Sequence, residues 1–171
     1  MPMSFIEPSY PADTEVAQLR TAELFGMAAF RLWAAPYLNP DTDHPDWRLG
    51  FAAAGIGCGG LGGFDTLMLL LSSAASRPLE ARCLHCTGLS RDEGLFLQLI
   101  SHLQQGRADL AAAVLGQWLP PAAVRVALEP AEALAEAMAG AGLVMPRRRA
   151  LDATDQVLHS LHGGPQLVWV H

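Results

Sequence analysis

The spacing of apolar residues along the chain predicts a succession of helices. The clearest signal lies within residues 89–106, where Ser90 and Glu93 form the S-x-x-E pattern of a capping box. The apolar residues that follow recur at helical spacing, at Phe96, Leu99, Ile100 and Leu103. Gly106 is suited to end this helix because glycine readily adopts the left-handed conformation found after helix ends.

The pattern before this helix predicts a first helix capped by Asp13 or Thr14 and ended near Ala35 by Pro36. After residue 106, further helices are expected at 108–119, at 122–128, from Pro130 onward and at 151–164.

No pair of alternating strand patterns accompanies these helices. Residues 1–12 are expected to form an extended arm and residues 165–171 an extended tail. The sequence therefore predicts an all-α fold, a single domain that spans residues 1–171 as a bundle of six to eight helices.

An apolar run beginning at Trp47 carries only two charged residues, Arg48 and Asp65, before Arg77. Its second half, from Phe64, is apolar nearly all round, which predicts a central buried helix.

The glycine-rich stretch 55–63, GIGCGGLGG, contains the spacing G-x-G-x-x-G. A dinucleotide site needs a strand before this spacing and a second strand beyond it, and neither is evident. A membrane helix needs about 20 apolar residues, and the uninterrupted run 49–64 is shorter. Membrane association through residues 49–71 stays a minor alternative. The favoured interpretation is a tight connection or kinked helix where glycines let neighbouring elements approach.

Composition favours association with protein rather than with nucleic acid. The chain is 51% hydrophobic and 16% charged, against about 25% charged in an average domain. This lean charge, with aromatic residues expected at the surface at Trp47 and Trp169, predicts a homo-oligomer or a protein partner. A net charge of −6 argues against nucleic acid, and the run Arg147–Arg149 is interpreted as a solvated turn.

The complete absence of lysine excludes some chemistry. All 11 basic residues are arginine, so pyridoxal-phosphate chemistry and a P-loop both lack their lysine. No G-x-S-x-G motif suggests a serine nucleophile. No catalytic set emerges, and an enzyme is not the favoured interpretation.

The strongest chemical feature is C-x-x-C at Cys83 and Cys86. Two cysteines at this spacing supply half of a tetrahedral zinc site. The other ligands would come from Cys58, His85 or His102, with His44 as a further candidate, and zinc is the only cofactor that the sequence suggests.

The same two cysteines could instead form a redox pair, which His85 would help by lowering a thiol pKa. A third hypothesis is that they are inert reduced thiols in a connector. An odd number of cysteines and the lack of a signal peptide favour a reducing cytoplasm.

Two other groups carry weaker signals. Asp155, His159 and His162 share one face of the last expected helix, where the helix dipole explains the histidines without a metal. The aspartates of residues 41–46 are interpreted as turn residues.

Two functions are therefore expected. The first is a cytoplasmic all-α regulatory, adaptor or chaperone-like module that self-associates. The alternative is a small zinc or thiol-redox protein centred on Cys83 and Cys86.

Overall fold

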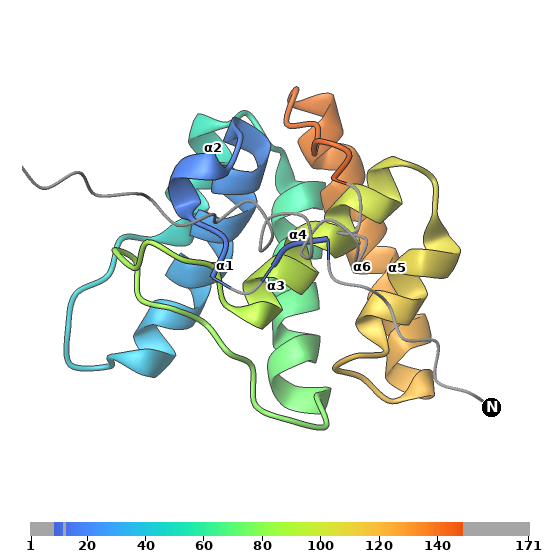
Figure 1. The fold of residues 1–171 in the computed structure, drawn as a ribbon, viewed down its shortest axis with the longest axis horizontal. Helices are drawn as coiled ribbons and strands as arrows, with labels where there is room; N and C mark the ends of the chain where they lie inside the picture. Colours follow the sequence, from blue (N-terminus) through green and yellow to red (C-terminus); the bar gives the residue numbers. More distant parts are fainter. Residues whose placement is uncertain (1–8, 12, 149–171) are drawn as a thin grey trace, which may run out of the picture.

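The computed structural model describes residues 9–11 and 13–148, and this part of the chain is an all-α bundle (Figure 1). Its elements are a 3-10 turn η1 (Val16–Gln18) and the helices α1 (Thr21–Leu38), α2 (Trp47–Ala53), α3 (Cys58–Ala74), α4 (Arg91–Gln104), α5 (Ala108–Leu115) and α6 (Pro121–Gly140). The expected helix at 151–164, Trp169 and the tail lie outside the described residues. The predicted fold class and helix number are confirmed.

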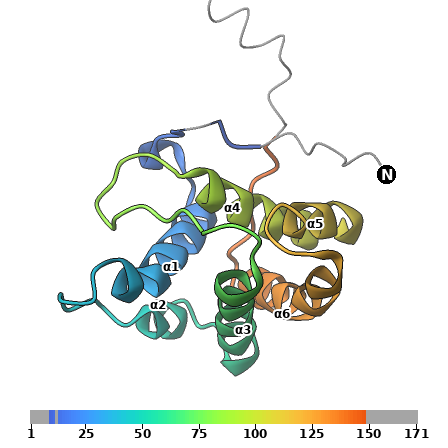
Figure 2. The same ribbon diagram turned by 90° about the horizontal axis from the view of Figure 1, so that it is seen from below.

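Helix α4 lies at the centre of the bundle, between α1 on one side and α5 and α6 on the other (Figure 2). Every residue from Asp92 to Ser101 is buried. The prediction that the helix after Phe64 would be central is wrong, because α3 packs mainly on α6 and leaves Leu69 half exposed on its outer face. The capping box of α4 is confirmed, since Ser90 and Glu93 exchange side-chain and backbone hydrogen bonds.

Three predicted helix boundaries are wrong, and a tertiary contact explains the first. Residues 13–16 do not begin α1, because the backbone there pairs with residues 87–89 of a long connector. Pro36 does not end α1 but lies within its last turn, and Pro130 does not begin a new helix but lies inside a continuous α6.

The glycine-rich stretch is a tight connection followed by a close helix contact, as the sequence favoured. Gly55 has φ of +72°, a left-handed value that glycine adopts without strain, and it separates α2 from α3. Gly60 and Gly63 face α6 so closely that a side chain would collide with it. The backbone of Pro130 occupies the space beside Gly63.

This connection divides residues 49–71 between two helices. Within the described part of the chain, every helix is too short or too polar to cross a lipid bilayer. Trp47 is 7% exposed and contacts Phe51 and Phe64 in the core, so the expectation that it lies on the surface is wrong.

The two ends of the described chain meet at a buried carboxylate, Glu23 on α1. Arg148 donates from Nη2 to Glu23 Oε2 over 3.0 Å, and Tyr10 donates its hydroxyl to Glu23 Oε1 over 2.8 Å. Burial of Glu23 acts to raise its pKa. The hydrogen bonds from Arg148, the Arg20 amide and Tyr10 act in the opposite direction and together have the larger effect, so the pKa of Glu23 lies below its usual range. Arg148 thus binds the core and is not part of a solvated turn.

The contact between α3 and α6 predicts opposite effects for neighbouring glycines. A Cβ on Gly63 would lie 2.6 Å from the Pro130 carbonyl oxygen and 3.2 Å from the Leu134 nitrogen. Because both are backbone atoms, Gly63→Ala should lower the free energy of unfolding by about 1–3 kcal/mol. Urea denaturation of the purified variant measures this.

Gly62→Ala is the matched control, since nothing lies within 4 Å of its Cβ position. It should raise stability by up to about 1 kcal/mol through helix propensity alone. Equal stability of the two variants would show that α3 and α6 do not meet at Gly63.

Candidate functional site

The connector between α3 and α4, residues 75–90, carries both cysteines of the C-x-x-C motif. It contains no helix or strand, and Cys83 at its tip is exposed. Long loops without secondary structure inside a compact domain are uncommon and are often functional. The backbone of this one is held at several points by buried side chains of the bundle.

The main anchor is a buried ion pair between Arg31 of α1 and Glu93 of α4, whose side chains are 1% and 0% exposed. Arg31 donates from Nε to Glu93 Oε1 and from Nη2 to Glu93 Oε2, each over 2.9 Å. The remaining Arg31 bonds reach the connector, with Nη1 to the Cys86 carbonyl over 2.7 Å and Nη2 to the Gly88 carbonyl over 2.8 Å. One guanidinium therefore binds both α4 and the connector from Cys86 to Gly88.

Glu93 holds the connector on the other side of the motif. Its Oε1 accepts the Arg82 amide over 2.8 Å, and its Oε2 accepts the Ser90 amide over 2.9 Å. Both oxygens are thus shared between an arginine and the backbone, so the charge is neutralised and its hydrogen-bonding capacity is used. The ion pair fixes residues immediately before Cys83 and after Cys86.

A second buried carboxylate, Asp92, holds the beginning of the connector. It accepts hydrogen bonds from Arg77, from the Glu80 amide over 2.7 Å and from the Trp118 indole over 2.9 Å. Burial of Asp92 acts to raise its pKa. Arg77 and these two donors act in the opposite direction and together have the larger effect, so the pKa of Asp92 lies below its usual range. Asp92 is therefore a charged anchor at neutral pH.

The N-terminal segment covers the far edge of the connector. Val16 donates its amide to the Thr87 carbonyl over 2.7 Å, and Leu89 donates its amide to the Thr14 carbonyl over 2.9 Å. Arg82 also forms an ion pair with Asp13. These contacts, together with Arg31, Glu93 and Asp92, hold the connector without help from the cysteines.

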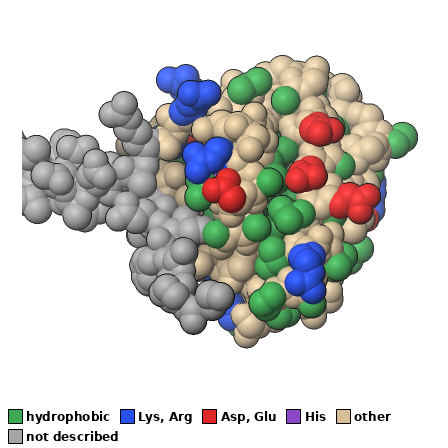
Figure 3. Space-filling model, turned by 90° about the vertical axis from the view of Figure 1, so that its right-hand side faces the viewer, with side chains coloured by type: hydrophobic (Ala, Val, Ile, Leu, Met, Phe, Trp, Pro, Cys, Tyr) green, Lys and Arg blue, Asp and Glu red, His purple; other side chains and the backbone are tan. Residues whose placement is uncertain are grey.

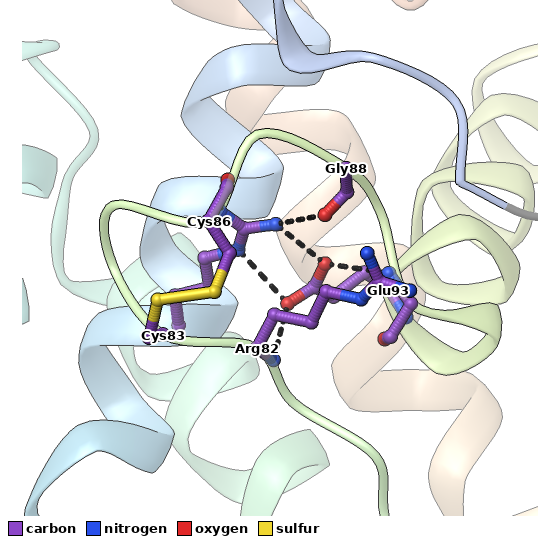
Figure 4. Close-up of a disulfide and its surroundings, with 7 residues drawn as sticks. Arg82, Cys83, Cys86, Gly88 and Glu93 are labelled. Carbon is purple, nitrogen blue, oxygen red and sulfur yellow. Dashed lines mark hydrogen bonds and ion pairs between the residues drawn. A yellow bond between two sulfur atoms is a disulfide. The ribbon is translucent and has the colours of Figure 1, made fainter.

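Cys83 and Cys86 are joined by a disulfide (Figure 4). Their Cα atoms are 5.3 Å apart, within the usual range for a disulfide of 4.4–6.8 Å. The Cys86 amide donates to the Cys83 carbonyl over 3.1 Å, which closes a turn through Leu84 and His85. Cys83 is exposed and Cys86 is half-buried, so the bond is accessible to a thiol from solution.

The five predicted metal ligands do not form a single group that could hold a metal ion. Cys58 is an exposed free thiol at the start of α3. His102 lies in the last turn of α4, where burial and then Arg107 lower its pKa. His85 lies between Cys83 and Cys86. Over the described residues no three histidine, cysteine or acidic side chains are grouped to hold a metal ion.

The other candidate residues have structural partners or lie elsewhere. His44 bonds the Asn39 carbonyl over 2.7 Å, and Asp46 caps α2 by accepting the Arg48 amide. Asp46 therefore has a structural role at the start of α2. Asp155, His159 and His162 lie outside the described residues.

Sequence reasoning missed Arg31 and Asp92 as anchors of the site, and recognised Glu93 only as a capping residue. A signal was present for Arg31, which stands between Phe30 and Leu32 in an apolar helix. A charge at such a position needs a buried partner. Nothing in the spacing, however, indicates which of the 17 acidic residues that partner is.

Comparisons of the chain with known protein families, with curated proteins and with solved structures found no match.

The buried ion pair predicts a strong and asymmetric response to mutation. Arg31→Met should lower the free energy of unfolding by about 3–5 kcal/mol, because the buried Glu93 carboxylate loses its cation. The double variant Arg31→Met with Glu93→Gln should recover part of this loss, since no unpaired charge remains. Urea denaturation followed by circular dichroism measures both.

Asp109→Asn is the control, because it removes one member of the exposed ion pair between Arg107 and Asp109 and should leave stability nearly unchanged. A similarly small effect of Arg31→Met would contradict the role assigned to the buried pair.

Proposed function

We propose that the protein is a thiol–disulfide protein whose working group is the pair Cys83 and Cys86. The observation that carries this proposal is an accessible disulfide in a connector that other side chains already hold in place. Arg31 and Glu93 bind the backbone on both sides of the motif. The bond can therefore open and close while its surroundings stay folded.

A purely stabilising role for the disulfide has less support. The two cysteines are three positions apart. A ring this short removes little entropy from the unfolded chain, about 2 kcal/mol on the loop-closure estimate, and long loops gain considerably more. Exposed disulfides are the class that exchanges with other thiols.

The reaction follows from ordinary sulfur chemistry. A substrate thiolate attacks the exposed sulfur of Cys83, the bond to Cys86 breaks, and its electron pair leaves on the Cys86 sulfur as a thiolate. A second substrate thiolate then attacks the substrate sulfur of this mixed disulfide and releases Cys83. The net change converts the protein disulfide and two substrate thiols into the protein dithiol and one substrate disulfide.

Zinc binding is the rival use of the same two residues. It would need two more ligands, and the described residues bring none to the pair. Thiol chemistry needs only the cysteines themselves.

We further propose the interaction module as a second function, with a second copy of this chain as the partner. An apolar groove of about 220 Å³ lies between α1, α3 and residues 77–81, and its lining includes Tyr37 and Leu38. These two side chains are 70% and 49% exposed. Figure 3 shows another face of the molecule, on which hydrophobic and charged side chains are interspersed. Burial of Tyr37 against a copy would remove apolar surface from water.

The thiol–disulfide proposal predicts a defined count of reactive thiols. After mild oxidation, alkylation and mass spectrometry should label Cys58 alone, the only free thiol in the structure. After reduction, all three cysteines should be labelled, with little change in circular dichroism because the connector stays anchored.

A zinc site would give a different result in the same sample. Purified without chelator, the chain would carry one metal ion, and chelation would lower the melting temperature. The double variant Cys83→Ser with Cys86→Ser is the control and should change neither fold nor metal content. Stoichiometric zinc would overturn the thiol–disulfide proposal.

The self-association proposal predicts a dimer in light scattering at micromolar concentrations. Tyr37→Glu should shift the mass toward the monomer, because a charge in the groove would have to be desolvated. Val126→Glu, at an exposed position of α6 away from the groove, is the control and should leave the dimer intact. A monomer in the unmodified protein would contradict the proposal.

A further inference from the structure

A hollow of about 540 Å³ lies directly beside the disulfide. It is lined by the turn of the connector at residues 84–87, by residues 15–17 of the N-terminal segment and by Arg31. Its volume falls within the range of sites that bind small molecules or side chains, roughly 300–1,000 Å³. Cys86 of the disulfide lines the hollow, and Leu84, which also lines it, is the residue next to Cys83. Groups attached to a thiol that reacts with Cys83 therefore come close to the hollow.

The walls of the hollow combine apolar surface with one uncompensated negative charge. Val16, Ala17 and Leu84 supply apolar atoms. Arg31 borders the hollow too, but its charge is neutralised by Glu93.

Glu15 is exposed, and no ion pair in the described residues includes it. The nearest other charged pair on this segment, Asp13 with Arg82, is neutral as a whole. Among the described residues that line the hollow, the only other side chain besides Glu15 and Arg31 that can carry a charge is His85, so Glu15 is the one carboxylate among them.

We propose that the hollow receives the residues that flank the reacting cysteine of a peptide or protein substrate, and that Glu15 selects neutral or basic substrates over acidic thiols. This proposal rests on the thiol–disulfide function described above. Small acidic thiols of the glutathione type gain least from the site, because they bring a carboxylate toward Glu15 and offer little apolar surface to Val16 and Leu84.

The interaction between Glu15 and a charge on the substrate sets the size of the expected preference. Unit charges about 4 Å apart in water interact by an amount that corresponds to about a fivefold change in rate. Salt reduces the effect, because the Debye length is about 10 Å at 0.1 M ionic strength. The selection should therefore be several-fold at low salt and should weaken as salt is added.

Two synthetic peptides test the proposal on the oxidised full-length protein. Both are five residues long with acetylated and amidated ends and a central cysteine, which is flanked by lysine in one and by glutamate in the other. Release of the Cys83–Cys86 thiols is followed by quenched alkylation and mass spectrometry, and each rate is divided by the concentration of peptide thiolate. Attraction of lysine and repulsion of glutamate can each contribute up to about fivefold, so the lysine peptide should react up to about 25-fold faster at low ionic strength.

The matched variants are Glu15→Gln and Glu129→Gln. Each removes one exposed negative charge, but Glu129 lies on α6 and does not line the hollow. Glu15→Gln should bring the ratio of the two rates close to one, and Glu129→Gln should leave it unchanged. A third peptide with glutamine on both sides should react at an intermediate rate in the unmodified protein.

The outcomes separate this inference from the function on which it rests. If both peptides open the disulfide at equal rates, or if Glu15→Gln leaves the ratio unchanged, the substrate preference is wrong and the thiol–disulfide function stands. If neither peptide opens the disulfide while a strong chemical reductant does, both proposals fail together.

Discussion

Glu93 and Arg31 form a charged contact out of reach of solvent, and the course of the connector depends on it. Removing two charges from water costs several kcal/mol each unless both are paired and fully hydrogen-bonded. Glu93 meets this condition with Arg31 and two backbone amides, and Arg31 meets it with Glu93 and two carbonyl groups. A connector that ran elsewhere would leave these bonds unmade inside the bundle.

The same reasoning explains why a helix with so many polar residues is the central one. Residues 92–101 are buried without exception, although they include two carboxylates, a glutamine and a serine. The two carboxylates stand in the first turn, where backbone N–H groups and the helix dipole favour negative charge. Each also accepts a hydrogen bond from an arginine and from the connector. Polar groups at the start of α4 thus join the helix core to the loop above it.

This arrangement places the cysteine pair in a loop and not at the start of a helix. A C-x-x-C motif at a helix start has its reactivity set largely by that helix. Here the motif occupies a turn ahead of the α4 cap, and its backbone is positioned by side chains from α1 and α4. Cys83 is exposed and Cys86 is half-buried, beside a hollow that the N-terminal segment also lines. Thiol chemistry at Cys83 is then compatible with a rigid backbone around it.

The sequence by itself determined the class of the fold and the elements with strong local signals. The helical spacing and capping box of α4 predicted its start at Ser90, because both depend on residues within one or two turns. The glycine-rich stretch was likewise interpreted correctly as a tight connection and a close contact, since glycine is the residue that permits both. The spacing of Cys83 and Cys86 also marked the pair as a candidate for zinc or thiol chemistry, but spacing alone did not separate these uses from an inert pair.

Only the tertiary structure decided which elements lie inside and which side chains meet. Local preference placed the central helix after Phe64 and began α1 near Thr14, but burial of α4 and pairing of residues 13–16 with the connector prevailed. The partnership of Arg31 with Glu93 spans 62 positions, and that of Arg148 with Glu23 spans 125. No local pattern encodes such pairs, because their free energy comes from desolvation and hydrogen bonding that exist only once the helices have packed.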